Sequence, residues 1–153
     1  MTLPFVKMHA HGDDFIIVDR RGEDNPITAQ IARYLGNRRF GIGFNQLAVV
    51  LDCEEAAARV QFWNPDGTRL HTCGSATRGV ADRLMHEAGT DTIVLRSDRG
   101  LLRCTRADGQ RVSVDMGPPS LDWASVPLDR AMDTCVLPID GQPAACSMGN
   151  PHC

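Results

Sequence analysis

Cys73 could act as a reactive thiol because of the residues that follow it in the stretch LHTCGSATRGVADRLMHEAG. Gly74 and Ser75 come next, and the residues after them have the apolar spacing of a helix. At the N-cap of that helix, unpaired backbone N–H groups and roughly half a positive charge favour a thiolate. The placement therefore predicts a lowered pKa for Cys73, and the N–H groups of Gly74 and Ser75 predict a binding site for a carboxylate.

A thiol that meets a bound carboxylate at a helix start is suited to one reaction in particular. A thiolate can remove the proton from the carbon next to the carboxylate, and the helix end stabilises the negative charge that develops there. Two other interpretations stay open at this level. Cys73 could be a small residue that only fills the helix start. It could also pair with His71 as the nucleophile of a cysteine hydrolase, although no third residue that would orient the histidine is evident.

The remaining histidines and cysteines give weaker signals. His9 and His11 would share one face of a strand, as in a metal pair, but no third ligand is evident, so we expect ordinary polar contacts and no metal site. The cysteine spacing contains no C-x-x-C motif, which argues against structural zinc. In a cytosolic chain of this size we expect all six cysteines to be free thiols: Cys53, Cys73, Cys104, Cys135, Cys146 and Cys153.

The composition excludes several classes of protein. Of the 153 residues, 42% are hydrophobic and 23% are charged, which is typical of a globular domain and not of a disordered chain. The net charge of -3 comes without a long basic run, so we expect no nucleic-acid partner. No segment has the roughly 20 apolar residues that cross a bilayer, and the first residues lack the pattern of a secretion signal. We therefore expect a cytoplasmic protein with no membrane partner.

The hydrophobic pattern predicts the helices that must position Cys73. A short helix is predicted over residues 27–36, with Thr28 as its N-cap and Gly36 as its end. A longer helix is predicted over residues 74–88, directly after the thiol. Its apolar face is expected to consist of Ala76, Val80, Ala81, Leu84, Met85 and Ala88.

Strands are predicted wherever β-branched and aromatic residues cluster between turn formers. The motif NPDGT at residues 64–68 predicts a turn on the way to Cys73, and ADGQ at residues 107–110 predicts the turn of a hairpin over residues 101–117. The order of strands, helix, strands, helix and strands favours an α+β fold over a regular βαβ alternation. The other predicted strands span residues 4–9, 14–20, 47–52, 58–64 and 92–97.

The last ten residues raise a question about domain organisation. AACSMGNPHC begins like a strand that should pair, turns at Asn150-Pro151 and stops at Cys153. Since a domain rarely ends directly after a turn, we expect residues 1–153 to form one domain, the N-terminal one, of a protein whose second half is absent from this chain.

Four blocks of the sequence are similar in order and spacing to the N-terminal half of the diaminopimelate epimerase family: KMHAHGDDF, GIGFNQL, FWNPDGTRLHTCGSATRG and SMGNPHC. The resemblance implies an isomerase that needs no pyridoxal or other cofactor and converts LL- to meso-diaminopimelate for lysine and cell-wall precursor synthesis. It also implies two similar halves, each a mixed or antiparallel barrel-like sheet wrapped around a central helix. The active site would lie between the halves, with one acid/base cysteine from each.

Carried over to this sequence, the resemblance implies that Cys73 is the first of the two acid/base cysteines. The second has no counterpart here, so the fragment alone is expected to be inactive and to need the missing C-terminal half as its partner. A homodimer is one oligomeric state compatible with the sequence. The backbone of Gly74 and Ser75 would bind the α-carboxylate, and two asparagines would hold the far end of the amino acid. The implied substrate-binding residues are Asp13, Gln46, Asn64, Gly74, Ser75 and Asn150.

Several positions depart from the family pattern. Asp13 stands where asparagine is usual and Asn45 where aspartate is usual, and CGSATRG replaces C-G-N-G-A-R-C, with Ser75 for asparagine and Ala76 for glycine. The Ser75 change is compatible with binding by backbone N–H groups. A carboxylate at Asp13 only accepts hydrogen bonds and could repel an acidic substrate. Two alternatives therefore remain beside the epimerase: a related amino-acid racemase with another substrate, and a non-catalytic amino-acid-binding protein on the same fold.

Overall fold

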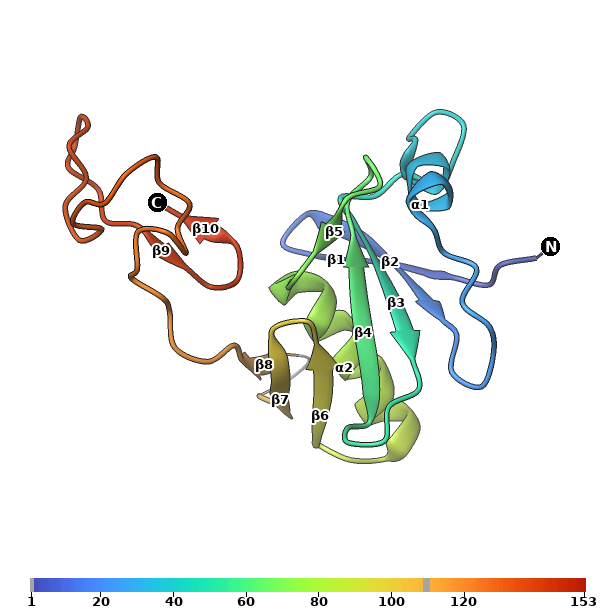
Figure 1. Ribbon diagram of the computed structural model, residues 1–153. Coiled ribbons are helices and arrows are strands. Elements are labelled where there is room, and N and C mark those ends of the chain that lie inside the picture. Colours follow the sequence, from blue (N-terminus) through green and yellow to red (C-terminus); the bar gives the residue numbers. More distant parts are fainter. Residues whose placement is uncertain (1, 109–110) are drawn as a thin grey trace. The chain divides into compact units, whose positions relative to one another are not determined.

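The computed structural model describes residues 2–108 and 111–153, which divide into two compact units, Met1–Asp115 and Met116–Cys153 (Figure 1). Residues 109 and 110 of the predicted ADGQ turn lie outside the described residues. In chain order the first unit contains β1 (Val6–Ala10), β2 (Asp13–Asp19), α1 (Ala29–Gly36), β3 (Gln46–Leu51), β4 (Ala58–Trp63), β5 (Arg69–Leu70), α2 (Gly74–Ala88), β6 (Thr92–Ser97), β7 (Gly100–Arg106) and β8 (Val112–Asp115).

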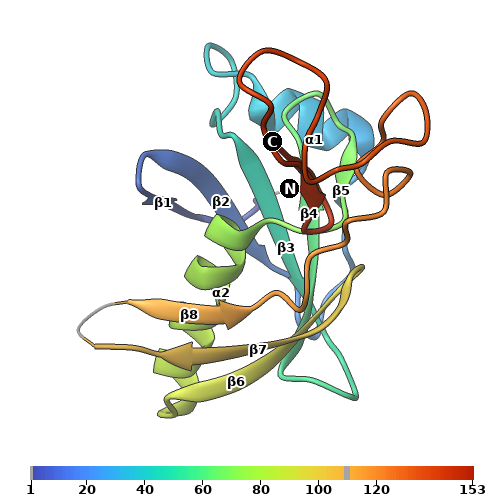
Figure 2. The same cartoon turned by 90° about the vertical axis from the view of Figure 1, so that its left-hand side faces the viewer.

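One curled sheet organises the first unit. Its described strands follow the order β1-β2-β3-β4-β6-β7-β8, and β5 pairs with β4 beside this path. Strand β2 is parallel to β3 and β4 is parallel to β6, whereas the other paired strands are antiparallel. The sheet wraps around α2 (Figure 2). This arrangement confirms the predicted α+β class and the predicted barrel-like sheet around a central helix.

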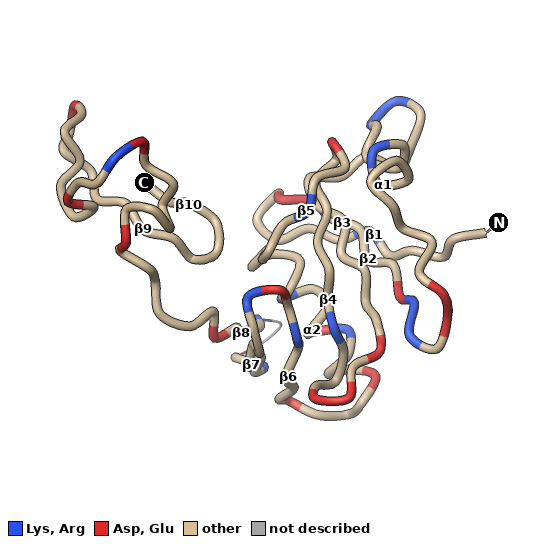
Figure 3. Tube along the Cα trace, viewed as in Figure 1, with Lys and Arg blue, Asp and Glu red and all other residues tan. Residues whose placement is uncertain are grey.

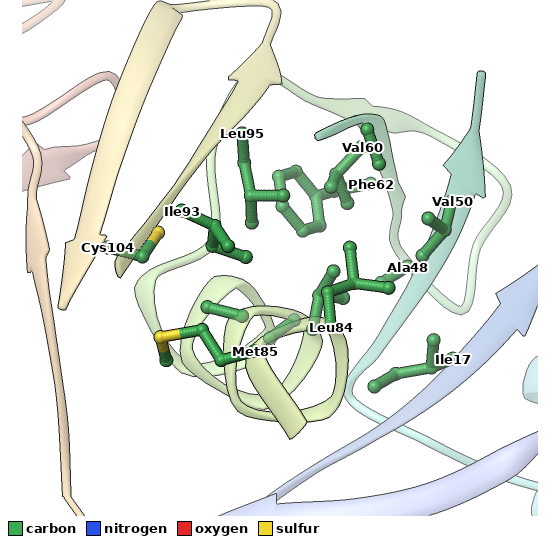
Figure 4. Close-up of a cluster of buried hydrophobic side chains, with 14 of the residues drawn as sticks. Ile17, Ala48, Val50, Val60, Phe62, Leu84, Met85, Ile93, Leu95 and Cys104 are labelled. Atoms are coloured by element: carbon green, nitrogen blue, oxygen red, sulfur yellow. The ribbon is translucent and has the colours of Figure 1, made fainter. Parts of the chain in front are cut away.

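The two faces of the sheet carry separate hydrophobic cores. On β2, Phe15 and Ile17 belong to the inner core, which packs against α2, whereas Ile16 and Val18 belong to the outer core. Figure 4 shows the inner core, in which side chains of the strands surround the helix. Because both faces of β2 are covered, its sequence is a continuous apolar run instead of an alternating one.

Helix α1 packs against the outer core. The side-chain oxygen of Thr28 accepts a hydrogen bond from the backbone N–H of Ile31 at 3.3 Å, which caps the helix start as predicted. Ala32 is fully buried in the outer core. The helix ends at Gly36, where a Cβ atom would lie 2.7 Å from Pro65, so glycine lets the NPDGT turn pack against the end of α1.

Helix α2 has the predicted bounds, Gly74–Ala88, and Cys73 is its N-cap residue. Its predicted apolar face is buried as far as Met85, but Ala88 is exposed, because the last turn before Gly89 lies at the surface. Gly79 is buried although the apolar pattern omits it. A Cβ atom at this position would lie 2.5 Å from the ring of Phe15, so the glycine permits close packing of α2 on β2.

The second unit has little regular structure. It contains β9 (Cys146–Ser147) and β10 (Pro151–His152), which form an antiparallel pair. The predicted strand near the end of the chain thus pairs with the segment that follows its own turn. Ser147 also exchanges two backbone hydrogen bonds with Ser120, at 2.8 and 2.9 Å. Within the described residues of both units, no helix is long and apolar enough to cross a membrane.

Candidate active site

Strand register places several of the predicted site residues at one end of the sheet. Asp13 and Phe15 are two residues apart on β2 and therefore face the same side, and Phe15 belongs to the inner core. Gln46, the first residue of β3, pairs with Phe15 in the parallel register, so it too lies on the inner face. Asp13 and Gln46 thus begin neighbouring strands and face the side of the sheet that α2 covers.

Asn64 and Cys73 belong to the same end of the sheet. Leu47 pairs with Trp63 in the antiparallel register of β3 and β4, so Asn64, one residue further, lies level with Gln46. After the NPDGT turn, β5 returns along β4, and the chain then reaches Cys73. The Asn64 side chain donates a hydrogen bond to Thr68 within that turn, at 2.9 Å. The register therefore brings Asp13, Gln46 and Asn64 to one edge of the fold, and the charge of Asp13 acts on the thiol of Cys73.

Cys73 is the N-cap residue of α2, as predicted. Its sulfur accepts a hydrogen bond from the backbone N–H of Ala76 at 3.5 Å. Its backbone oxygen accepts from the N–H of Thr77 at 2.9 Å and from the Thr77 hydroxyl at 2.7 Å. The side chain is half-buried and packs against the inner core. The position of the thiol is thus fixed by both the helix cap and the core.

The predicted lowering of the Cys73 pKa is wrong. Burial of the thiol is the largest influence and raises its pKa, and the negative charge of Asp13 raises it further. The backbone N–H groups of Ala76 and Ser75 and the charge of Arg78 act in the opposite direction but do not prevail. The helix end therefore lowers the pKa of Cys73 as expected, but the surroundings of the thiol raise it by more.

The start of α2 is open enough for a ligand to reach the backbone. A Cβ atom added to Gly74 would meet only one atom within 4 Å, the Nη1 of Arg78 at 3.5 Å. The Nη2 of Arg78 also lies within hydrogen-bond distance of the Ser75 hydroxyl, at 3.5 Å. Sequence reasoning missed Arg78, although its position three residues after Ser75 puts both on one helix face. The backbone N–H groups at the helix start and this guanidinium form a positive pole beside Cys73.

A polar network fixes the neighbouring loop. The basic segment after α1 (Figure 3) includes Arg38, whose guanidinium binds both oxygens of Asp14, at 2.6 and 2.9 Å, and the side-chain oxygen of Asn45, at 2.9 Å. The side-chain amide of Asn45 donates to Asp13 at 2.9 Å. Lys7 forms an ion pair with Asp14 at 3.3 Å. Asp13 and Asn45, two positions that depart from the family pattern, are therefore hydrogen-bonded to each other.

The two adjacent carboxylates have different surroundings. Hydrogen bonds from Arg38, followed by those from Lys7, lower the pKa of Asp14 to about 2. Asp13 receives the Asn45 amide but, among the described residues, forms no ion pair with any cation. Lys7 and Arg38 thus both pair with Asp14, and no ion pair to Asp13 is found within the described part of the chain.

Three buried side-chain atoms have no hydrogen-bond partner within the described residues: Gln46 Oε1, Trp63 Nε1 and Thr72 Oγ1. Gln46 lies on the inner face beside Asp13, and Thr72 directly precedes the thiol. A buried acceptor without a donor costs free energy, so such atoms are usually satisfied by a ligand, a water molecule or another segment. The carbonyl oxygen of Gln46 is therefore an unfilled acceptor at the candidate site.

Neither of the two alternatives that involve a histidine, a metal pair or a Cys-His couple, is supported. Strand β1 ends at Ala10 and His11 lies in the following turn with a φ of 54°, so His9 and His11 do not share a strand face. His71 is exposed, and none of the hydrogen bonds found over residues 2–108 joins it to Cys73. The same described region contains no group of three His, Cys, Asp or Glu residues arranged to hold a metal ion. All six cysteines are free thiols, as predicted.

Asn150 belongs to the second unit. It lies in the turn between β9 and β10, where its backbone oxygen accepts from the N–H of Met148 at 3.0 Å. Its side-chain oxygen is 3.2 Å from the Nε2 of His152. The side chain is exposed and available for other contacts. Its predicted role in binding substrate remains a prediction.

A family model described as diaminopimelate epimerase matches residues 5–121. Among curated proteins, the chain is 47% identical over 154 residues to a diaminopimelate epimerase of Gluconobacter oxydans, covering 99% of this chain and 57% of that protein. It is 41% identical over 160 residues to one of Phenylobacterium zucineum, covering 99% of this chain and 58% of that protein. The chain therefore spans little more than half the length of these relatives.

Solved structures of lower identity share the fold. A probable proline racemase from Agrobacterium radiobacter has a TM-score of 0.59 at 18% identity and covers 79% of this chain and 44% of its own. A hydroxyproline epimerase from Agrobacterium vitis has a TM-score of 0.57 at 16% identity and covers 85% of this chain and 45% of its own. At these identities the likeness concerns the fold alone.

Proposed function

The chain belongs to the diaminopimelate epimerase family, and we propose that it is the N-terminal half of a cofactor-independent amino-acid epimerase in which Cys73 exchanges the α-proton of the substrate. The observation that carries this proposal is the position of Cys73 at the N-cap of α2, beside a backbone that a ligand can approach. The family relationship supports diaminopimelate as the substrate, converted from the LL to the meso form in lysine and cell-wall precursor synthesis in the cytoplasm.

In the proposed reaction, the backbone N–H groups of Gly74 and Ser75 bind the α-carboxylate, and Arg78 adds a positive charge. The Cys73 thiolate takes the α-proton, so the Cα–H bond breaks, an S–H bond forms and the electron pair passes into the carboxylate. The helix end and Arg78 stabilise this charge. A second acid then protonates Cα from the opposite face, which inverts the centre.

The raised pKa of Cys73 assigns a resting state to the thiol. Because burial and Asp13 disfavour the thiolate, Cys73 carries its proton before substrate binds. A protonated thiol is the form that donates a proton in a two-base inversion. To act as the base, Cys73 must lose this proton, and the positive pole at the start of α2 is the local feature that favours the loss.

The 153-residue chain holds only part of this machinery. Since it spans 57% of the Gluconobacter oxydans relative, we assign the second acid/base group to the remaining length of the full protein. We also assign Asn64 and Asn150 to the far end of the substrate. The 153-residue chain alone is therefore proposed to be inactive.

The full-length gene product that contains this chain tests the proposal. With LL-diaminopimelate in deuterated water, it should incorporate deuterium at the α-carbon, and Cys73→Ala should abolish the incorporation. Cys53→Ala is the matched control, since Cys53 is also a half-buried thiol but lies in the loop between β3 and β4. Undiminished incorporation in Cys73→Ala rejects the assignment of the thiol.

One observation favours a second candidate, a non-catalytic amino-acid-binding protein: the surroundings of Cys73 hold the thiol in its unreactive form. Titration calorimetry and racemisation assays on the full-length protein separate the two functions. Tight binding of an amino acid without turnover supports the binding protein, and measurable racemisation rejects it.

A further inference from the structure

Two donors of Thr77 hold the backbone oxygen of Cys73. The N–H of Thr77 donates to this oxygen at 2.9 Å, and the Thr77 hydroxyl donates to it at 2.7 Å. The first is the ordinary hydrogen bond of a first helical turn, between residues four apart. The second is additional, and the side chain that supplies it is only 1% exposed. A buried hydroxyl of α2 is therefore bound to the residue that carries the thiol.

The bonded oxygen belongs to the peptide group that joins Cys73 to Gly74. Peptide groups in the described part of the chain are trans, so the C=O and N–H of this planar group point in opposite directions. Its oxygen faces Thr77, one turn further along α2. The Gly74 N–H is therefore directed away from the body of the helix, toward the open start of α2. The hydrogen bonds of Thr77 thus determine the direction of this N–H.

The peptide group needs such a restraint because glycine follows it. A rotation of the plane changes ψ of Cys73 and φ of Gly74 together, and glycine has no Cβ atom to limit φ. Packing does not replace the missing restraint, since a Cβ atom at Gly74 would meet only Arg78 within 4 Å. The same rotation would break both hydrogen bonds to Thr77. Thr77 therefore opposes the freedom that Gly74 introduces at the place where a ligand can approach.

The other N–H groups at the helix start have a second task. The N–H of Ala76 donates to the Cys73 sulfur at 3.5 Å, and the N–H of Ser75 also acts on the thiol. Of the two N–H groups assigned to the α-carboxylate, that of Ser75 is thus shared with the sulfur. A bound carboxylate then depends more on the N–H of Gly74, and hence on its direction.

We propose that Thr77 is a positioning residue, which fixes the peptide plane between Cys73 and Gly74 and so directs the Gly74 N–H at the α-carboxylate of the substrate. The inference rests on the proposed function, which assigns that carboxylate to the start of α2. A donor that is already aligned loses little freedom on binding, and it stabilises the charge that develops as the α-proton leaves.

The hydroxyl adds to the efficiency of this site and is not required for the reaction. The family pattern C-G-N-G-A-R-C has alanine where this chain has Thr77, so the family pattern keeps only the N–H donor at this position. Removing the hydroxyl should therefore weaken catalysis several-fold without abolishing it. The effect should appear in the binding of the carboxylate and in the proton transfer, because the same N–H serves both.

The experiment measures kcat and KM for LL-diaminopimelate with the full-length gene product. Thr77→Val removes the hydroxyl and keeps the branched shape, and Thr77→Ala removes it with a residue that the family fold accepts. Thr77→Ser keeps a hydroxyl. The matched control is Thr134→Val, because Thr134 is also buried and its hydroxyl also donates to a backbone oxygen at 2.7 Å, that of Leu121 in the second unit.

Thr77→Val and Thr77→Ala should lower kcat/KM about 3- to 10-fold, which is the range expected for the loss of one neutral hydrogen bond. KM should rise and kcat should fall. Thr77→Ser should restore both constants toward the wild type. Thr134→Val should lose stability in urea unfolding but keep the wild-type kcat and KM. A purely structural role of Thr77 would have the same signature as this control.

Two kinds of result contradict the inference. If Thr77→Val and Thr77→Ala keep the wild-type kcat and KM, or if Thr77→Ser loses as much activity as they do, the hydroxyl does not direct the Gly74 N–H. The inference is then wrong while the proposed function, which Cys73→Ala tests, stands. If the wild-type protein exchanges no α-proton of LL-diaminopimelate, the proposed function fails, and the inference fails with it.

Discussion

Replacing Gly79 by alanine tests the packing that places Cys73. Gly79 lies in the middle of α2, where the chain buries it against Phe15 and Met8. A new Cβ atom would lie 2.5 and 2.6 Å from two ring carbons of Phe15, which is about 1 Å shorter than an ordinary contact. Phe15 is only 1% exposed, so the ring has little room to move. Either the ring or the whole helix must shift.

Two opposing effects determine how much Gly79→Ala changes the free energy of unfolding. Alanine in a helix interior is about 1 kcal/mol more favourable than glycine, whereas an extra methyl group in a packed core costs about 1–3 kcal/mol. We expect Gly79→Ala to lower the free energy of unfolding by about 1–2 kcal/mol, since the methyl group meets a rigid ring. In the same helix, Gly74→Ala meets only Arg78 at 3.5 Å and should change the stability by less than about 0.5 kcal/mol.

Urea unfolding followed by far-UV circular dichroism measures both variants against the wild type. The reasoning requires Gly79→Ala to be clearly less stable than Gly74→Ala. If Gly79→Ala is as stable as the wild type or more stable, helix propensity prevails over the overlap, and the close approach of α2 to β2 is not as described.

Three further predictions concern separate parts of the first unit. Arg38→Gln should raise the pKa of Asp14 from about 2 toward 3.8, which carboxyl titration by NMR measures. In the wild type, the stabilisation by the Arg38–Asp14 pair is present at neutral pH and should disappear as the pH falls from 3.8 to about 2, which unfolding measured across this range checks. Because burial raises the pKa of Cys73, alkylation by iodoacetamide should be slow at neutral pH and accelerate only above the usual thiol range, and rapid reaction at neutral pH contradicts this. Thr28→Ala should cost about 1 kcal/mol of stability in urea unfolding, whereas Gln30→Ala, at an exposed position of the same helix, should cost almost nothing.

The elements of the first unit could be predicted from the sequence because their signals are local. Thr28 precedes an apolar helical pattern and accepts the capping hydrogen bond, and Cys73 takes the same position at the start of α2. Strands of β-branched and aromatic residues are found close to their predicted bounds. The buried Gly79 could not be predicted in this way, since the reason for the glycine is the ring of Phe15, 64 residues earlier in the chain.

The sequence indicates where the candidate site lies, but it does not predict which charged side chains of the site pair with each other. The blocks around Cys73 and Asn64 indicate where a site lies, because the turn and the helix start are adjacent in sequence. The contact between Asp13 and Asn45 joins residues 32 apart, and Arg38 reaches Asp14 across 24 residues. The spacing of residue types along the sequence does not predict these two long-range contacts. As separate departures, Asp13 and Asn45 suggest a weakened site, whereas together they form one hydrogen bond.

The error about Cys73 follows from the same division between local and long-range effects. A helix end acts over a single turn and always favours the thiolate, so sequence alone gives its sign correctly. Burial against the inner core and the charge of Asp13 both come from elements distant in sequence, and together they prevail. The N-cap motif therefore determines where the sulfur lies, and the sheet determines how readily it loses its proton.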